Sequence, residues 1–292
     1  VGDPAMMRRL VVNADDLGAD GPRNEGIFEA IEAGVVTSAS LLANGPALED
    51  AIARIRSLKK RKVSFGFHLN LSQGKPLAAG HRQLVGPDGG FPGKITAQKL
   101  LMQRGNADLE KEIAAEMESQ LARLRDAGIE VRHMDGHQHV HVFPAVTPSA
   151  LRLAERHGIR WVRMPDEPVP VAAGSPEPEY HGLYEEARIF SALAAEARVH
   201  FEGTRVKKTD AFRGLYLKGR LTVELLEEVL VNLPAGLTEL MVHPGRETAG
   251  DDGPFSYFST PERLGELKAL VNDRFKAALA RCGVDLVSFL EA

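Results

Sequence analysis

Four of the ten histidines lie close together, at His133, His137, His139 and His141, and Asp135 lies among them. An imidazole binds divalent metals in its neutral form and exchanges protons near neutral pH. A single histidine of this kind would fit an ordinary polar surface loop. Four of them beside a carboxylate predict instead a metal site or a proton-transfer site.

The sequence around this cluster indicates a strand followed by a helix. The segment 129–131 follows Gly128 and is typical of a short strand, and the segment 144–157 is typical of a helix. The histidines are therefore expected in the loop between the two. A loop in that place can direct several side chains toward one point.

The composition excludes several classes of protein. The formal net charge is −4 and the basic run at 59–62 is short, so no nucleic-acid partner is expected. Apolar runs are too short to span a membrane and no signal peptide is recognised, so no membrane association is expected. The single cysteine, Cys282, excludes a disulfide framework and predicts a cytoplasmic protein.

Strand and helix patterns alternate along the chain almost without interruption. Apolar runs predict strands at 9–13, 35–42, 63–69, 129–131, 159–164, 238–242 and 284–289, and a further strand is expected at 206–210. Helical spacing predicts helices at 22–33, 47–59, 108–127, 144–157, 184–201, 222–232 and from 260 onward. Glycine and proline interrupt the pattern at 72–92, which predicts a long loop that could act as a lid. The segment 165–178 is rich in proline and is expected to be an excursion with little secondary structure. We expect one domain over 6–292, with residues 1–5 a vector-derived remnant.

This alternation predicts an α/β fold with seven or eight mostly parallel strands, and it favours a closed or nearly closed (β/α) barrel over an open doubly wound sheet. In such a barrel the C-terminal ends of the strands share one face, where active sites are built. Eight reactive side chains lie at or just after predicted strand ends: Asp15, Asp16, His68, Asp135, His137, Arg163, Asp210 and His243. We therefore expect residues far apart in the sequence to meet at that face.

Two common kinds of site are not supported. The glycines at 18–21 follow a strand, but they form neither a G-x-G-x-x-G fingerprint nor a phosphate-binding loop with its lysine. No G-x-S-x-G sequence places a nucleophilic serine, and Cys282 lies in the pattern of an amphipathic helix. Of the common kinds of catalytic chemistry, this leaves hydrolysis in which a bound metal activates water.

Six motifs give the chain a resemblance to a known family. They are VNADDLG (12–18), GVVTS (34–38), FHLNL (67–71), DGHQHVH (135–141), RMP (163–165) and ELMVHPG (239–245). Together they resemble the YdjC-like carbohydrate deacetylases, which include the chitooligosaccharide deacetylase ChbG, and more distantly the NodB-type polysaccharide deacetylases. The resemblance covers nearly the whole chain from Arg8 onward. It implies a distorted (β/α) barrel and divalent-metal-dependent removal of an N-acetyl group from a sugar.

The resemblance also implies a metal site and a base. Asp16, His68 and His137 match the metal ligands, and Asp15 matches the general base. Two imidazoles and one carboxylate leave coordination positions open for water and substrate. One divalent ion is expected, Mg²⁺ or Zn²⁺, and Mn²⁺ or Co²⁺ also suits mixed oxygen and nitrogen ligands. Leu17 stands where the family commonly has Phe, which leaves this ligand set intact. Without the histidine motifs, the aspartate pair would fit an ordinary turn before a helix.

Five further residues have less specific expectations. Asp135 is expected to orient a ligand, while His139 and His141 either orient ligands, line the sugar pocket or lie exposed. Arg163 is expected to hold the base ionised or to contact substrate, with a structural ion pair as the alternative. His243 is expected to be the acid that protonates the departing amine, and an ordinary loop histidine is the alternative.

These residues predict a hydrolase that removes the N-acetyl group from a small N-acetylated sugar and releases acetate. Two alternatives stay open: a metal-dependent hydrolase of another acyl amide or ester, and a non-catalytic sugar-binding regulator. A binding protein needs no base beside a complete ligand set, so Asp15 favours catalysis. The expected partner is the small sugar alone, without nucleic acid or membrane, and the sequence leaves a homodimer open.

Overall fold

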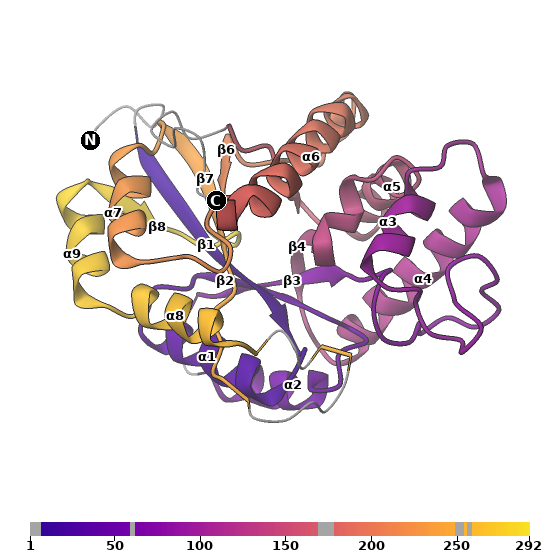
Figure 1. Ribbon diagram of the computed structural model, residues 1–292, viewed down its shortest axis with the longest axis horizontal. Helices are drawn as coiled ribbons and strands as arrows, with labels where there is room; N and C mark the ends of the chain where they lie inside the picture. The colour runs from indigo at the N-terminus through magenta and orange to yellow at the C-terminus, as the bar shows by residue number, and fades with distance from the viewer. Residues whose placement is uncertain (1–6, 59–61, 169–177, 249–253, 256–258) are drawn as a thin grey trace.

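The computed structural model describes residues 7–58, 62–168, 178–248, 254–255 and 259–292. Helices surround one parallel sheet in this structure (Figure 1). Within these ranges, the helices are too short or too polar to cross a membrane. The predicted N-terminal remnant, most of the basic run at 59–62 and most of the proline-rich excursion lie outside the described residues.

The described residues form eight strands. They are β1 (Arg8–Leu17), β2 (Ser38–Leu41), β3 (Ser64–Leu69), β4 (Val131–Gly136), β5 (Trp161–Val162), β6 (Ala211–Arg213), β7 (Gly236–Val242) and β8 (Val284–Leu286). The hydrogen-bonded order is β5-β4-β3-β2-β1-β7-β6, β8 also pairs with β1, and all these pairings are parallel. Leu10, Val11 and Val12 of β1 are fully buried, as expected for a parallel strand covered on both faces.

The two ends of this strand order approach each other and close the sheet into a barrel. Lys207, just before β6, forms a bridge with Trp161 of β5. Backbone hydrogen bonds of 2.7 and 2.9 Å join Lys207 to the residues on either side of Trp161. On the other side, β8 pairs with Arg8–Leu10, whereas β2 pairs with β1 from Asn13 onward. The strands β2 and β8 thus pair with different parts of the same edge of β1. The sheet as a whole forms the predicted distorted (β/α) barrel.

Helices cover the outside of the barrel (Figure 1). They are α1 (Gly21–Glu32), α2 (Leu48–Ser57), α3 (Lys94–Leu101), α4 (Ala107–Asp126), α5 (Thr147–His157), α6 (His181–Ala197), α7 (Val223–Val231), α8 (Pro261–Leu270) and α9 (Asp273–Arg281). Local signals set their ends: the Asp20 side chain caps α1, Thr222 caps α7, and Gly158, with a φ of +70°, ends α5.

Most predicted elements are confirmed, and five differ. β4 begins at Val131, where the strand predicted at 129–131 ends, and it contains residues 132–136 of the predicted loop. β1 continues through Leu17, so the two adjacent aspartates lie in the strand rather than in the predicted loop. The strand predicted at 206–210 is wrong because β6 begins only at Ala211. The last predicted helix is divided into α8 and α9, and α3 follows the long loop where no helix was predicted. The shift of β1 matters most, because it sets the geometry of the site.

Candidate metal centre and active site

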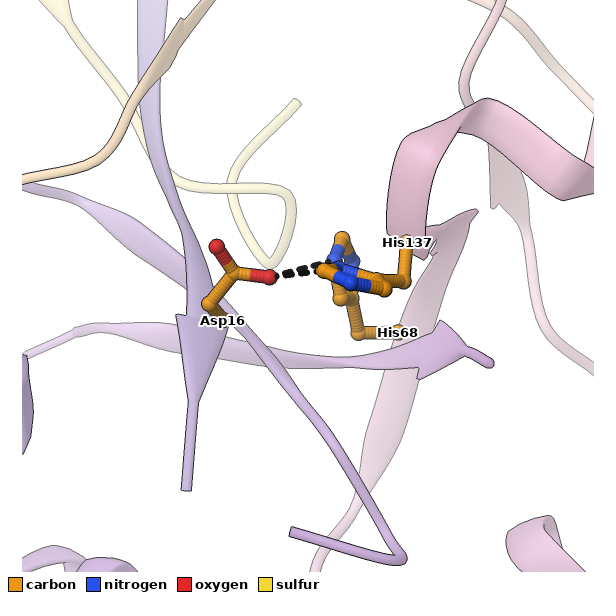
Figure 2. Close-up of side chains that lie close together, drawn as sticks. All are labelled: Asp16, His68 and His137. Carbon is orange, nitrogen blue, oxygen red and sulfur yellow. Dashed lines mark hydrogen bonds and ion pairs between the residues drawn. The ribbon is translucent and has the colours of Figure 1, made fainter. Parts of the chain in front are cut away.

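Three side chains from different strand ends converge on one point (Figure 2). Asp16 lies near the end of β1, His68 near the end of β3, and His137 directly follows β4. Oδ1 of Asp16 lies 2.8 Å from Nδ1 of His137 and 3.2 Å from Nε2 of His68. All three residues are buried, and their potential ligand atoms lie within 4.8 Å of one another. The structure therefore assembles the ligand set that the resemblance implied.

An irregularity in β1 directs Asp16 toward the histidines. The register of β1 against β2 shifts between Ala14 and Leu17, and Asp16 has a left-handed φ of +65°. In a regular strand, Asp15 and Asp16 would point to opposite faces. Here both carboxylates line the same cavity, which is how a bulge re-aims a side chain. Left-handed non-glycine residues are uncommon and cluster at functional sites.

The contacts of the two histidines fit a bound cation. His68 Nδ1 lies 2.6 Å from Asp135 Oδ1, while its Nε2 faces Asp16. His137 Nδ1 faces Asp16, while its Nε2 contacts Gln73 Oε1. A neutral imidazole carries one N–H, so it cannot donate to an acceptor on both sides. A cation between the histidines and Asp16 would satisfy the remaining nitrogen lone pairs, and an outer N–H held by an acceptor is the usual arrangement of a metal-binding histidine.

Asp16 is held as a carboxylate by its surroundings. Burial acts to raise the pKa of Asp16, but His137, His68 and Arg23 outweigh burial and hold this pKa well below its usual range. Arg23 of α1 is fully buried, and its Nη1 lies 3.2 Å from Asp16 Oδ2. Asp16 therefore presents Oδ1 to the histidines and Oδ2 to the guanidinium.

Arg163 joins three buried carboxylates. Its two terminal nitrogens donate to the two oxygens of Asp15, each at 2.6 Å. Nη2 also lies 2.9 Å from Asp135 Oδ2, and Nε donates to Glu239 Oε1 at 2.8 Å. The Arg163 side chain is only 1% exposed, so these charge-assisted bonds form away from water. Arg163 therefore pairs with Asp15 and its charge favours the ionised carboxylate, but burial outweighs it in the pKa of Asp15.

Asp15 lines the cavity beside Asp16, His68 and His137. Burial raises the pKa of Asp15, and the charge of Asp135 adds to this rise while Arg163 opposes it. Oδ1 accepts hydrogen bonds from Asn13 and Arg163, and Oδ2 accepts one from Arg163. Each carboxylate oxygen has two lone pairs, so these contacts leave one on Oδ2. A carboxylate with a raised pKa is a better proton acceptor.

His133 has a structural environment, unlike His137 and His139, which line the cavity. It lies inside β4 rather than in the predicted loop, and it contacts Ser64 Oγ and Asn13 Oδ1, both at 3.0 Å. Burial lowers the pKa of His133 to about 3, so the ring is neutral. Beside it, Ser40 donates to Asp135 Oδ2 at 2.7 Å. This network fixes Asp135, which in turn orients His68.

His139 and His141 are both buried, so neither is the exposed residue that one expectation allowed. His139 lines the cavity, and its ring packs edge-on against Phe190 with the centroids 4.6 Å apart. Burial, with Arg163 adding to it, holds the pKa of His139 well below its usual range, so this ring is uncharged. His141 Nε2 donates to the Arg163 carbonyl at 3.0 Å and therefore supports the arginine.

His243 directly follows β7 and lines the cavity. Its backbone N–H donates to Glu266 Oε2 at 2.6 Å, and its Nδ1 lies 3.9 Å from the same oxygen. Burial, with the charge of Arg263 adding to it, holds the pKa of His243 well below its usual range. The ring is therefore neutral at rest, and it must gain a proton before it can act as the predicted acid.

The cavity has a volume of about 220 Å³ and is lined by charged and polar side chains. Beyond the residues above, Lys94, Glu186 and Lys218 form part of its wall. Glu186 Oε1 lies 2.6 Å from Lys94 Nζ, and its Oε2 lies 3.1 Å from Lys218 Nζ. Burial lowers the pKa of Lys218, and the negative charge of Glu186 partly offsets this lowering. These groups offer hydrogen-bond donors and an acceptor to a small ligand that carries hydroxyl groups.

Asp210 is the predicted residue that the structure removes from the site. It precedes β6, and its Oδ2 accepts a hydrogen bond from Leu237 N–H at 2.8 Å, near the start of β7. It therefore lies at the N-terminal end of the strands, away from the cavity. The sequence analysis also missed residues that contact the site or line the cavity: Arg23, Gln73, Lys94, Glu186, Lys218, Glu239, Arg263 and Glu266. A charged residue inside an apolar strand was the available signal for Glu239.

Comparisons with known proteins identify the family and the fold of this chain. A sequence profile of the YdjC-like protein family matches residues 9–281. A carbohydrate deacetylase from Homo sapiens is 38% identical over 95% of this chain and 89% of its own length. One from Geobacillus stearothermophilus is 32% identical over 98% of both chains. A crystal structure from Enterococcus faecalis, whose name proposes cellobiose-phosphate cleavage, shares the fold with a TM-score of 0.71 at 22% identity, over 98% of this chain and 100% of that one. The chain belongs to the YdjC-like protein family.

Proposed function

We propose that this protein is a metal-dependent hydrolase that removes the N-acetyl group from a small N-acetylated sugar and releases acetate. The observation that carries the proposal is the convergence of Asp16, His68 and His137 beside Asp15 in one cavity. The relatives named as carbohydrate deacetylases, at 32% and 38% identity, support a sugar as the substrate.

Asp16, His68 and His137 would hold one divalent ion, with Zn²⁺ or Mg²⁺ as the first choices and Mn²⁺ or Co²⁺ as further ones. Such an ion, when bound, polarises the acetyl carbonyl and makes water more acidic. The chain itself supplies the orientation of the ligands. Asp135 fixes the His68 ring, and Arg23 holds the second oxygen of Asp16.

The proton transfers are assigned to Asp15 and His243. Water adds to the acetyl carbon and gives a proton to Asp15, which Arg163 holds at the edge of the cavity. The carbon–nitrogen bond then breaks as the nitrogen gains a proton, and acetate and the free amine leave. We assign the delivery of that second proton to His243, which lines the same cavity. Its neutral ring first takes up a proton from solvent, and the proton on Asp15 returns to solvent after the products leave.

An acetate-release assay tests this proposal. Purified protein, treated with a chelator and resupplied with one metal at a time, is incubated with a panel of N-acetylated mono- and disaccharides. We expect acetate from at least one sugar, only after metal is restored. Release from aryl acetates or simple acyl amides but from none of the sugars would favour the other hydrolase. Sugar binding without any acetate release would favour a non-catalytic regulator.

A further inference from the structure

His68 and His137 present different ring nitrogens to Asp16, and a residue outside the proposed ligand set contacts the other nitrogen of His137. We propose that Gln73 is a positioning residue that keeps the proton of His137 on Nε2, so that His137 offers Nδ1 to the metal. This inference rests on the proposed metal site. His68 shows the reverse arrangement, because its Nδ1 faces Asp135 and its Nε2 faces Asp16.

Two donors converge on one oxygen of Gln73. Oε1 lies 2.5 Å from His137 Nε2 and 3.2 Å from the side-chain nitrogen of Gln138. Gln138 donates through an amide N–H, so the atom of Gln73 that faces it must be the acceptor oxygen. A carbonyl oxygen accepts and never donates. His137 therefore carries its proton on Nε2, and the lone pair of Nδ1 points to Asp16 Oδ1 at 2.8 Å.

The backbone around Gln73 is fixed by a buried asparagine. Asn70 is fully buried, and its side-chain nitrogen donates to the carbonyl of Gln73 at 2.8 Å while its Oδ1 accepts from Gln73 N–H at 3.2 Å. Gln120 of α4 holds the backbone of Asn70 on both sides, with bonds of 3.1 and 2.7 Å. Gln73 is therefore attached to α4 through two polar side chains.

The same helix anchors the loop that follows. Glu116, which is fully buried, accepts backbone N–H bonds from Leu77 and Ala78. Glu112 accepts backbone N–H bonds from three consecutive residues at 82–84. Polar residues at 112, 116 and 120 thus form one stripe on α4 that faces the loop. This anchoring supports a fixed platform for Gln73 in place of a lid.

Metal affinity measures the role of Gln73. Gln73→Leu removes the acceptor at similar size, and we expect Zn²⁺ to bind about 10- to 100-fold more weakly by titration calorimetry, the usual cost of losing such an outer contact. Gln73→Glu keeps an acceptor and should stay close to wild-type affinity. Gln83→Leu makes the same change in the same loop away from His137 and is the matched control. Wild-type affinity in Gln73→Leu would overturn the inference, as would an equal loss in the control.

A measurement on the unaltered protein covers the case in which Gln73→Leu fails to fold. Long-range ¹H–¹⁵N spectra of the Zn²⁺-loaded wild type identify the protonated nitrogen of each histidine ring. We expect Nε2–H for His137 and Nδ1–H for His68. Coordination of His137 through Nε2 would overturn the inference while leaving the proposed function intact. A wild type that binds no metal at all would overturn both.

Discussion

Asp15 and Asp16 are adjacent in β1, yet a different arginine holds each of them. Arg163 binds both oxygens of Asp15 at 2.6 Å, whereas Arg23 lies 3.2 Å from one oxygen of Asp16 and leaves the other facing the two histidines. The bulge in β1 lets both carboxylates line one cavity. Metal binding and proton transfer are therefore assigned to neighbouring residues that mutation can separate.

The ligand assignment predicts joint loss of metal and activity. Asp16→Ala, His68→Ala and His137→Ala should each lower the metal content of the purified protein to well below one ion per chain, because two ligands bind a divalent ion poorly. Elemental analysis and acetate release measure the two losses. His200→Ala, at an exposed histidine outside the cavity, is the control. Full metal occupancy in the His137→Ala protein would contradict the assignment.

The assignment of Asp15 as the base predicts loss of activity without loss of metal. Asp15→Asn should retain the metal but lower turnover by about 10²- to 10⁴-fold, because an amide cannot take a proton from water. Arg163 can still donate to the amide oxygen, so the local structure is expected to persist. Metal content and turnover are measured on the same preparation. Turnover equal to that of the wild type would show that Asp15 serves only the structure.

Arg163 should be essential for stability as well as for activity. Arg163→Met leaves three buried carboxylates without their shared cation, and removing one partner of a buried ion pair costs about 3–5 kcal/mol. Urea unfolding measures the change. Arg160→Met, at an exposed residue just before β5, is the matched control and should change stability little. Equal stability of the two variants would mean that the carboxylates find other partners.

Glu239 should make the stability depend on pH. Burial raises the pKa of Glu239 from 4.5 to about 7, so the folded state holds a proton that the unfolded state releases. The contribution of Glu239 to stability should therefore be lost as the pH rises from about 4.5 to 7, and comparison with a variant that does not titrate separates it from the other buried groups. Glu239→Gln cannot lose that proton, so its stability relative to the wild type should increase between about pH 5 and pH 8, by up to roughly 3 kcal/mol at 1.4 per pKa unit. Glu228→Gln, at an exposed residue, is the control. If the difference in stability between Glu239→Gln and the wild type did not change with pH, the raised pKa of Glu239 would be contradicted.

His243 should matter more for poor leaving groups than for good ones. An amide nitrogen must be protonated before it leaves, whereas an aryl acetate expels a stable phenolate. His243→Ala should therefore slow hydrolysis of the N-acetyl sugar far more than that of an aryl acetate, with metal content unchanged. Equal losses on both substrates would mark His243 as a cavity residue without an acid role. His139, which also lines the cavity, would then be the next candidate.

The sequence by itself determined the fold class and the positions of the central residues. Alternating strand and helix patterns require a parallel sheet, and in such a sheet the ends of β1, β3, β4 and β7 lie on one face. That rule brings Asp16, His68 and His137 to the same face as other reactive residues, and the family resemblance implies that these three are the metal ligands. Asp210 was placed wrongly because the segment 206–210 was predicted as a strand that ends at Asp210, while pairing with β7 begins only at Ala211.

Only the tertiary structure decided which residues support the site. Arg23 lies in α1 and Gln73 in the loop after β3. In neither place does the sequence pattern predict which side chain contacts the site. Their contacts depend on how α1 and the loop after β3 pack, and packing joins residues that are distant in sequence. The shared cavity of Asp15 and Asp16 likewise depends on a register shift between β1 and β2. A sequence pattern of period two predicts alternation, and only the paired strands reveal where that alternation is interrupted.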